Sequence, residues 1–310
     1  MLAGTDSGVY RVPERRFEGA EQVLGGVGIR QLDSGDGVVF AASGSGVIRS
    51  TDGGKRWETV GPPVEDVHAV TSTERGVYAG VQPARLYVSD DSGETWTAQA
   101  GFEAVAAGSS WPNLPDRTEA CVRDIAVVDD TILVGVEVGG LVVSTDGGAS
   151  FEAVGSVPAD VHHVLAVGSS HWIVSCGTGG PGGHGGVFET TTAGDRWVER
   201  DIGTAEYVRE SCYRDCLYTA ANETAPLWDP PDATLFAERD GTLAPRQYPG
   251  GPESYVISWA TGADHIFAGT NDGAILRGPG EWERLGTVPV SAEAQRAWGV
   301  RSLTVPTVKR

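Results

Sequence analysis

The sequence predicts an all-β protein, folded as a single seven-bladed β-propeller of four-stranded blades, and three observations carry this prediction. The 310 residues include 44 glycines and no long apolar stretch with a period of 3.6 residues, which indicates many short strands joined by tight turns. A pattern of serine, aspartate, glycine and an aromatic residue recurs along the chain. A short apolar run ending in small residues occurs seven times, and each occurrence predicts one blade.

The apolar runs set the spacing of the units. The first three end about 38 residues apart, and the seven small-residue ends lie near Gly4, Ala42, Gly80, Gly135, Ser175, Ala221 and Gly269. The unit that begins at residue 122 reads as four strands: VRDIAVVD, TILVGVE, GLVVST and SFEAVG. Because one four-stranded sheet cannot cover both of its faces, we expect the units to stack radially and close into a ring.

The two ends of the chain predict how the ring closes. The chain begins with the second strand of a unit, MLAGT, followed by the third, GVYRV. The segment WGVRSLTVP, residues 298–306, matches a first strand and has no second strand after it. We therefore predict one domain, residues 1–310, whose first blade combines residues 1–26 with residues 298–310.

The recurring pattern has three good copies, RSTDGGKRW (49–57), VSDDSGETW (88–96) and VSTDGGASF (143–151), and a degenerate one, ETTTAGDRW (189–197). It resembles the Asp-box, or BNR, repeat of sialidases, sortilin-type receptors and photosystem II assembly factors. In those families the turn joins the two outer strands, away from the ligand face. The resemblance therefore implies a structural turn; a cation or partner site on the rim is the alternative.

Each position of the pattern has a local role in such a turn. The aspartate carboxylate can accept backbone N–H groups, the glycine permits positive φ, and the aromatic ring is buried against the next turn. The structural residues expected from the three good copies are Ser50, Asp52, Gly54, Trp57, Ser89, Asp91, Gly93, Trp96, Ser144, Asp146, Gly148 and Phe151.

The segment YRVP, residues 10–13, resembles the signature that carries the first arginine of a sialidase. The repeat alignment argues against that role, because SGVYRVP overlays SGVIRST of the next unit and places Arg11, like Arg49, on a third strand. A sialidase also needs a Tyr/Glu nucleophile pair and an acidic acid/base. The sequence alone assigns no catalytic residue.

The expected inner strands carry a positively charged or titratable residue at their third position. Read in register they are GIRQLD, DVHAVT, CVRDIA, DVHHVL, YVRESC, SYVISW and GVRSLT. Six of the seven units place arginine or histidine there, and the seventh has an apolar residue near Val256 or Ile257; the six are Arg30, His68, Arg123, His162, Arg209 and Arg301. Because inner strands line the central channel, we expect this ring at one channel mouth.

Two interpretations of the ring stay open. In the first, each base pairs with a nearby acid such as Asp66, Asp124, Asp160 or Glu210 and connects adjacent blades. In the second, the ring binds a carboxylate, a phosphate or an acidic segment, which arginine can engage bidentately.

Long loops are expected on the same face as this mouth. They span residues 101–120, 177–186, 222–233 and 286–298, and three of them carry a tryptophan: Trp111, Trp228 and Trp298. Aromatic rings beside charges suit sugar stacking or anchoring of a peptide. The alternative is that the tryptophans cap the blade ends.

Charge and cysteine content narrow the environment and the partners. The net charge is −19, and Lys55 and Lys309 are the only lysines. This composition is typical of proteins kept soluble in high salt, as in halophiles, and it argues against a nucleic-acid partner. Four cysteines suit a reducing compartment, and we interpret Cys121, Cys176, Cys212 and Cys216 as buried thiols rather than metal ligands.

These observations favour a non-catalytic recognition or assembly propeller, similar in its repeat to the photosystem II assembly factors. Its expected ligand is a protein segment or a small anionic or carbohydrate ligand at the Arg/His mouth. We expect a cytoplasmic protein with no membrane insertion, since no signal peptide or apolar run of about 18 residues is present. We also expect a monomer that binds no metal and no cofactor. The alternative is a glycoside hydrolase, sialidase-like, or a lyase acting from the same face.

Overall fold

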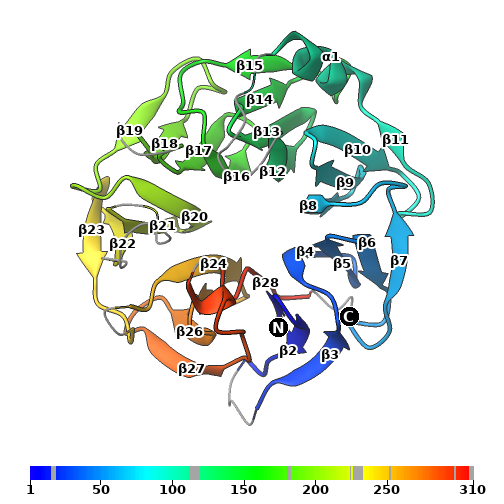
Figure 1. The fold of residues 1–310 in the computed structure, drawn as a ribbon. Coiled ribbons are helices and arrows are strands. Elements are labelled where there is room, and N and C mark those ends of the chain that lie inside the picture. The colour runs from blue at the N-terminus through cyan, green and yellow to red at the C-terminus, as the bar shows by residue number, and fades with distance from the viewer. Residues whose placement is uncertain are drawn as a thin grey trace.

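The chain folds into seven four-stranded antiparallel sheets arranged as a ring (Figure 1). The structure is a computed structural model that describes residues 1–14, 19–109, 111, 119–179, 183–223, 225, 233–250, 253–296 and 298–306. The predicted all-β, seven-bladed propeller is thereby confirmed. None of the helices in these ranges has the length and apolar character needed to cross a membrane.

The first blade combines the two ends of the chain, and blades two to four follow in sequence order. From the channel outward, blade one consists of β28 (Ser302–Thr304), β1 (Leu2–Thr5), β2 (Gly8–Arg11) and β3 (Glu21–Gly25). Blade two consists of β4 (Ile29–Gly35), β5 (Val38–Ser43), β6 (Gly46–Ser50) and β7 (Glu58–Gly61). Blade three consists of β8 (Val67–Thr73), β9 (Gly76–Val81), β10 (Arg85–Ser89) and β11 (Thr97–Ala98). Blade four consists of β12 (Cys121–Val128), β13 (Thr131–Glu137), β14 (Gly140–Ser144) and β15 (Glu152–Val154).

Blades five to seven complete the ring. Blade five consists of β16 (Val161–Gly168), β17 (His171–Cys176), β18 (Gly186–Thr190) and β19 (Val198–Arg200). Blade six consists of β20 (Tyr207–Arg214), β21 (Cys216–Asn222), β22 (Thr234–Arg239) and β23 (Thr242–Arg246). Blade seven consists of β24 (Val256–Thr261), β25 (Ile266–Thr270), β26 (Ala274–Gly278) and β27 (Glu283–Thr287).

The C-terminal strand closes the ring as predicted. Strand β28 pairs with β1 in antiparallel register, with Ala3 opposite Leu303 and Gly4 opposite Ser302. The side chain of Ser302 also accepts a hydrogen bond of 2.8 Å from the backbone N–H of Leu32 in blade two. The closing strand therefore connects to the blades on both of its sides.

The hydrophobic core is divided among the contacts between blades. Seven clusters of buried residues each join two neighbouring blades. At several contacts a glycine on a second strand faces a β-branched residue of the next inner strand. A Cβ on Gly80 would lie 2.3 Å from a methyl carbon of Val122, and one on Gly135 would lie 2.6 Å from a methyl carbon of Val161. The small residues that end the apolar runs thus let adjacent sheets approach closely.

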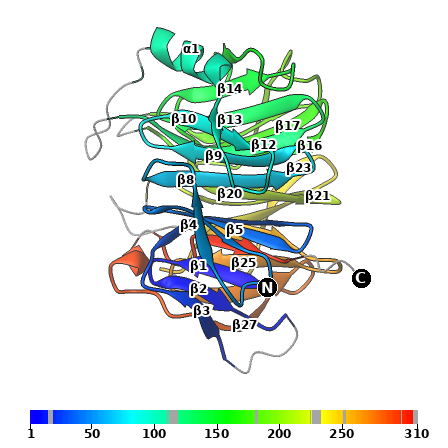
Figure 2. The same ribbon diagram turned by 90° about the vertical axis from the view of Figure 1, so that its right-hand side faces the viewer.

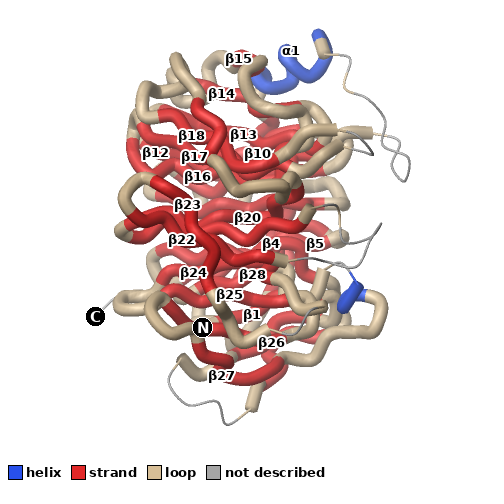
Figure 3. Tube along the Cα trace, turned by 90° about the vertical axis from the view of Figure 1, so that its left-hand side faces the viewer, coloured by secondary structure: helices blue, strands red, loops and turns tan. Residues whose placement is uncertain are grey.

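Both helices lie on one side of the ring, which is called the upper face below (Figures 2 and 3). Helix α1 (Ala100–Gly108) connects blades three and four, and the 3₁₀-helix η1 (Ala294–Arg296) precedes β28. Since both helices lie in connections that lead to an inner strand, the inner strands begin at the upper face.

Candidate site at the upper mouth of the channel

The predicted Arg/His positions coincide with irregularities in the inner strands. The pairing register of each inner strand from β4 to β24 shifts at this position, and the residues there are Arg30, His68, Arg123, His162, Arg209 with Glu210, and Ile257. Arg301 immediately precedes β28. A β-bulge re-aims the extra side chain away from the normal alternation of the sheet. The bulges therefore bring equivalent residues to one level at the start of the inner strands.

Four of these residues meet acids at the mouth. Arg30 forms an ion pair with Asp66, and the His68 Nε2 atom lies 3.6 Å from an oxygen of the same carboxylate. The Arg123 Nε atom lies 3.4 Å from Glu137 Oε2. His162 Nε2 lies 3.4 Å from Asp160 Oδ1. Asp66 and Asp160 were among the acids expected from the sequence, whereas Glu137 was not.

Arg209 and Arg301 instead stack on Trp298. The guanidinium carbon of Arg209 lies 4.0 Å from the centroid of the Trp298 ring, and that of Arg301 lies 4.6 Å from it. The guanidinium carbon of Arg123 lies 5.9 Å from the same centroid. Trp298 therefore joins the ring at the mouth, where three guanidinium groups surround one indole.

Arg209 is the residue of this set with the fewest polar contacts. It is 5% exposed, and its guanidinium also lies over the ring of Tyr207, at 5.4 Å. Within the described residues its Nε atom has no hydrogen-bond partner. The sequence explains the difference from Arg30, whose partner Asp66 lies two residues before the bulge of the next blade. The equivalent residue next to Arg209 is Tyr255, which cannot neutralise a guanidinium.

Asp124 and Glu210, which the first interpretation of the ring named as partners of the bases, belong to a second ring deeper in the channel. Asp124 follows the bulge residue Arg123, and Glu210 is the second residue of the irregularity at Arg209. Each accepts a hydrogen bond from the next blade: Asp124 from the Val164 N–H at 2.8 Å, Glu210 from the Trp259 N–H at 3.3 Å. Gln31, His163 and Ser302 accept from the next blade in the same way. The interpretation that Asp124 and Glu210 pair with the bulge residues is therefore wrong. Their side chains point toward the next blade, where each accepts a backbone hydrogen bond that connects two neighbouring blades.

The second ring lines a cavity of about 370 Å³ that contains Asp124, His163 and Glu210. Burial, together with the nearby charge of Asp124, raises the pKa of Glu210 to about 8. Burial also lowers the pKa of His163, whose Nε2 atom lies 3.6 Å from Asp124. The channel therefore favours the neutral forms of Glu210 and His163.

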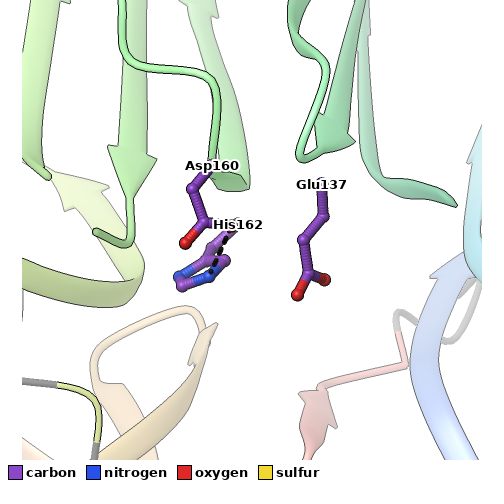
Figure 4. Close-up of side chains that lie close together, drawn as sticks. All are labelled: Glu137, Asp160 and His162. Atoms are coloured by element: carbon purple, nitrogen blue, oxygen red, sulfur yellow. Dashed lines mark ion pairs between the residues drawn. The ribbon is translucent and has the colours of Figure 1, made fainter. Parts of the chain in front are cut away.

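Three acid and imidazole side chains converge at the mouth between blades four and five (Figure 4). Glu137, at the end of β13, and Asp160 and His162, at the start of β16, are all buried and offer ligand atoms within 4.8 Å of one another. Burial raises the pKa of Asp160, but His162, the Gly179 N–H and Arg209 outweigh it and bring this pKa to about 2. The sequence signal for Glu137 was slight: an acid at the end of the buried run TILVGV.

The other predicted aromatic residues contribute differently. Trp111 packs against Phe102 of α1, with ring centroids 6.1 Å apart, and lines a groove of about 470 Å³ beside that helix. This placement matches the alternative in which a tryptophan caps a blade end. Trp228 lies outside the described residues. The cysteines are free thiols, of which Cys121, Cys176 and Cys212 are buried and Cys216 is half-buried.

The repeated turn has a closed local network between its third and fourth strands. Asp52 Oδ1 accepts hydrogen bonds of 2.9 and 2.8 Å from the N–H groups of Lys55 and Arg56, and Ser50 accepts one of 2.8 Å from the Gly54 N–H. Equivalent bonds hold the turns around Asp91 and Asp146.

These turns are also tied to the preceding blade. Arg11 donates to the Gly53 carbonyl at 2.9 Å, and Arg49 donates to the equivalent Ser92 carbonyl at 2.7 Å. Arg11 lies on β2, the third strand of its blade, as the repeat alignment predicts. This hydrogen bond to the turn of the next blade accounts for the position of Arg11, so no substrate-binding role is needed to explain it.

The fold and the ring of bulges define the class of protein: a seven-bladed propeller whose candidate site lies at one mouth of its channel. No protein-family model matches the chain, and no curated protein matches its sequence. Among solved structures, the GH74 xyloglucanase from Xanthomonas campestris is similar over 92% of this chain and 52% of its own, with a TM-score of 0.64 and 17% identity.

Two further solved structures share the fold. An ancestral GH74 enzyme is similar over 91% of this chain, with a TM-score of 0.61 and 16% identity, and this chain spans 37% of its length. YCF48 from Cyanidioschyzon merolae is similar over 83% of this chain and 84% of its own, with a TM-score of 0.58 and 14% identity. At these identities the likeness defines the fold and leaves activity to the site itself.

Proposed function

We propose that the protein is a non-catalytic recognition propeller that binds an anionic group, carried by a protein segment or a small ligand, at the upper mouth of its channel. The observation that carries this proposal is Arg209. A guanidinium that is 5% exposed and has no ion pair within the described residues retains its charge and most of its donors for a ligand.

The surroundings of Arg209 fit an anion. Its planar group is fixed between Tyr207 and Trp298, and Arg301 lies against the same indole. A guanidinium held in this way loses little conformational entropy when it binds a carboxylate bidentately. Asp66, Glu137 and Asp160 lie against the other bases of the mouth, whereas Arg209 and Arg301 lie against the Trp298 indole, so these two guanidinium groups are the ones placed to meet an anion.

The test is the replacement of Arg209 by alanine, with binding of fluorescent acidic peptides carrying a free C-terminal carboxylate measured by anisotropy. We expect at least a roughly tenfold loss of affinity, because a charge-assisted hydrogen bond contributes about 1.5–3 kcal/mol. The melting temperature should change little, since Arg209→Ala breaks no ion pair among the described residues.

The control for this test is Arg239→Ala, which removes an exposed arginine at the end of β22, away from the mouth. This variant should bind like the wild type. Equal binding by Arg209→Ala and wild type would contradict the proposal. Loss of the fold in Arg209→Ala would favour the interpretation in which the ring only connects blades.

A glycoside hydrolase is the second candidate, and one observation favours it. Glu210 and Asp124 line one cavity, and the pKa of Glu210 is raised to about 8, as the pKa of the general acid is raised in hydrolases. Both are engaged in bonds between blades, which argues for a structural role. The test is to incubate the wild type and Glu210→Gln with a panel of aryl glycosides and to measure the sugar released. Release by the wild type that is lost in the variant would support the hydrolase.

We also infer a monomer adapted to a salt-rich cytoplasm, on the basis of the net charge of −19 and the scarcity of lysine. A melting temperature that rises steeply between dilute buffer and molar KCl would support this inference. A salt-independent melting temperature would contradict it.

A further inference from the structure

We propose that Glu137, Asp160 and His162 form a binding site for one divalent transition-metal ion at the contact between blades four and five. The three residues come from two adjacent blades and all lie at the upper mouth (Figure 4). The site does not depend on anion binding at Arg209, and it departs from the expectation that the chain binds no metal.

The orientation of His162 is the first support. Its Nδ1 atom lies 2.7 Å from the carbonyl oxygen of Val208, so this nitrogen carries the proton and donates it. The Nε2 atom then faces Asp160. Metal-binding histidines in proteins usually donate their other ring N–H to a carbonyl or a carboxylate in this way, which fixes the tautomer and the ring plane.

The separation of the ligand atoms is the second support. His162 Nε2 and Asp160 Oδ1 are 3.4 Å apart, which is longer than a good N–H···O hydrogen bond. Two ligand atoms bound at about 2.1 Å to a tetrahedral ion lie about 3.4 Å from each other. Glu137 offers the third ligand atom within 4.8 Å of the other two, and rotation of its side chain can close the remaining distance.

The chain around the site is shaped to hold these groups together. Asp160 Oδ2 accepts a hydrogen bond of 2.8 Å from the Gly179 N–H, which orients the carboxylate. A Cβ on Gly177 would lie 2.3 Å from His162 Cε1 and 2.4 Å from Asp160 Oδ2. A glycine at position 177 is therefore required for the imidazole and the carboxylate to stay side by side.

Blade three supplies an internal comparison. His68 and Asp66 have the same sequence offset as His162 and Asp160, and their side chains also meet, at 3.6 Å. Ser43 pairs with Ile29 as Val136 pairs with Val122, so the residue equivalent to Glu137 in the preceding blade is Gly44, which has no side chain. Asp66 is paired with Arg30 instead. Of these two contacts, the one between blades four and five is the one that has a third ligand.

Two cations compete with a metal ion: Arg123, whose Nε atom lies 3.4 Å from Glu137 Oε2, and Arg209, whose charge interacts with Asp160. A carboxylate has two oxygens and can bridge a guanidinium and a metal ion. One imidazole and two carboxylates suit Zn²⁺ or Mn²⁺ better than Mg²⁺ or Ca²⁺, which prefer oxygen ligands alone.

The experiment is calorimetric titration of the chelator-treated full chain with Zn²⁺, together with the absorption spectrum of the Co²⁺ form. We expect one ion per chain, no competition by millimolar Mg²⁺, and a Co²⁺ spectrum of low coordination number. The near-isosteric variants Glu137→Gln, Asp160→Asn and His162→Gln should each bind at least about tenfold more weakly, and so should Gly177→Ala, which alters geometry without removing a ligand.

His184→Gln is the matched control. His184 is an exposed histidine 3.1 Å from Glu199 and 3.9 Å from Glu206, so it offers the same ligand types on the surface. This variant should bind Zn²⁺ like the wild type. Absence of stoichiometric binding in the wild type, unchanged binding in Glu137→Gln and Asp160→Asn, or loss of binding in His184→Gln would each overturn the proposal, whether or not acidic peptides bind at Arg209.

Discussion

Glu210 shows how one residue of the inner strand can serve the structure while carrying an unusual ionisation state. It lies in the channel, accepts a hydrogen bond from the Trp259 N–H and interacts with the charge of Asp124. Its side chain keeps some contact with the channel cavity yet is surrounded by protein, which makes the ionised form costly. Ionisation of Glu210 should therefore lower the free energy of unfolding.

The corresponding prediction concerns the pH dependence of stability. The pKa of Glu210 is about 8 in the folded protein and 4.5 in its ordinary state, so the folded chain holds more protons than the unfolded chain between these values. The contribution of this group to the free energy of unfolding is full below pH 4.5 and is lost as the pH rises through 8. The slope is at most about 1.4 kcal/mol per pH unit.

Glu210→Gln should remove this slope, because the amide stays neutral at every pH. The measurement is urea unfolding of wild type and variant at pH 5, 6.5 and 8, where the difference between their free energies of unfolding should grow in favour of the variant. The exposed Glu281→Gln should show no such trend. Parallel pH profiles for wild type and Glu210→Gln would contradict the predicted ionisation.

At the scale of elements, the second strand of each blade is shaped by the blade that packs on it. Gly135 in β13 faces Val161 and Val164 of the next inner strand, where a Cβ would lie 2.6 Å and 3.4 Å from their methyl carbons. Gly135→Ala should therefore lower the free energy of unfolding by about 1–3 kcal/mol, as expected for overpacking of a well-packed contact.

Gly155→Ala is the matched control for this effect. No atom lies within 4 Å of a Cβ added at Gly155, and its backbone does not have positive φ, so the change should stay within about 0.5 kcal/mol. Chemical denaturation of the two variants measures the difference. Equal stability of both would mean that adjacent sheets do not approach as closely as the structure indicates.

The strands could be predicted from the sequence because the same short apolar run recurs seven times, and aligning these runs aligns the strands of all seven blades. The site could be predicted only in part. The repeat located Arg209 and Arg30 at equivalent positions, but their partners depend on the neighbouring blade, which supplies Tyr255 to one and Asp66 to the other. Glu137 was missed for the same reason: its closeness to Asp160 arises from packing between blades, which no spacing along the chain encodes.

At the scale of the whole molecule, closure determines whether seven weak units form one cooperative structure. Each buried cluster joins two blades, so opening any one contact exposes apolar faces on both. Blade one is held by β28, which carries Leu303 into the cluster shared with blade seven. Ser302 of the same strand bonds to Leu32 of blade two, and Thr304 bonds to Ser34. The ring is therefore closed by β28, the last strand of the described residues.

Deletion of residues 298–310 should consequently unfold the protein. The truncated chain lacks β28, leaves the inner edge of β1 unpaired, and exposes the faces of blades one and seven that Val300 and Leu303 cover. The measurement is thermal unfolding followed by circular dichroism and calorimetry. Deletion of residues 307–310 alone, which leaves β28 in place, should melt like the full chain, whereas the longer deletion should show no cooperative transition. A cooperative transition at the wild-type temperature in the longer deletion would mean that β28 is not needed to close the ring.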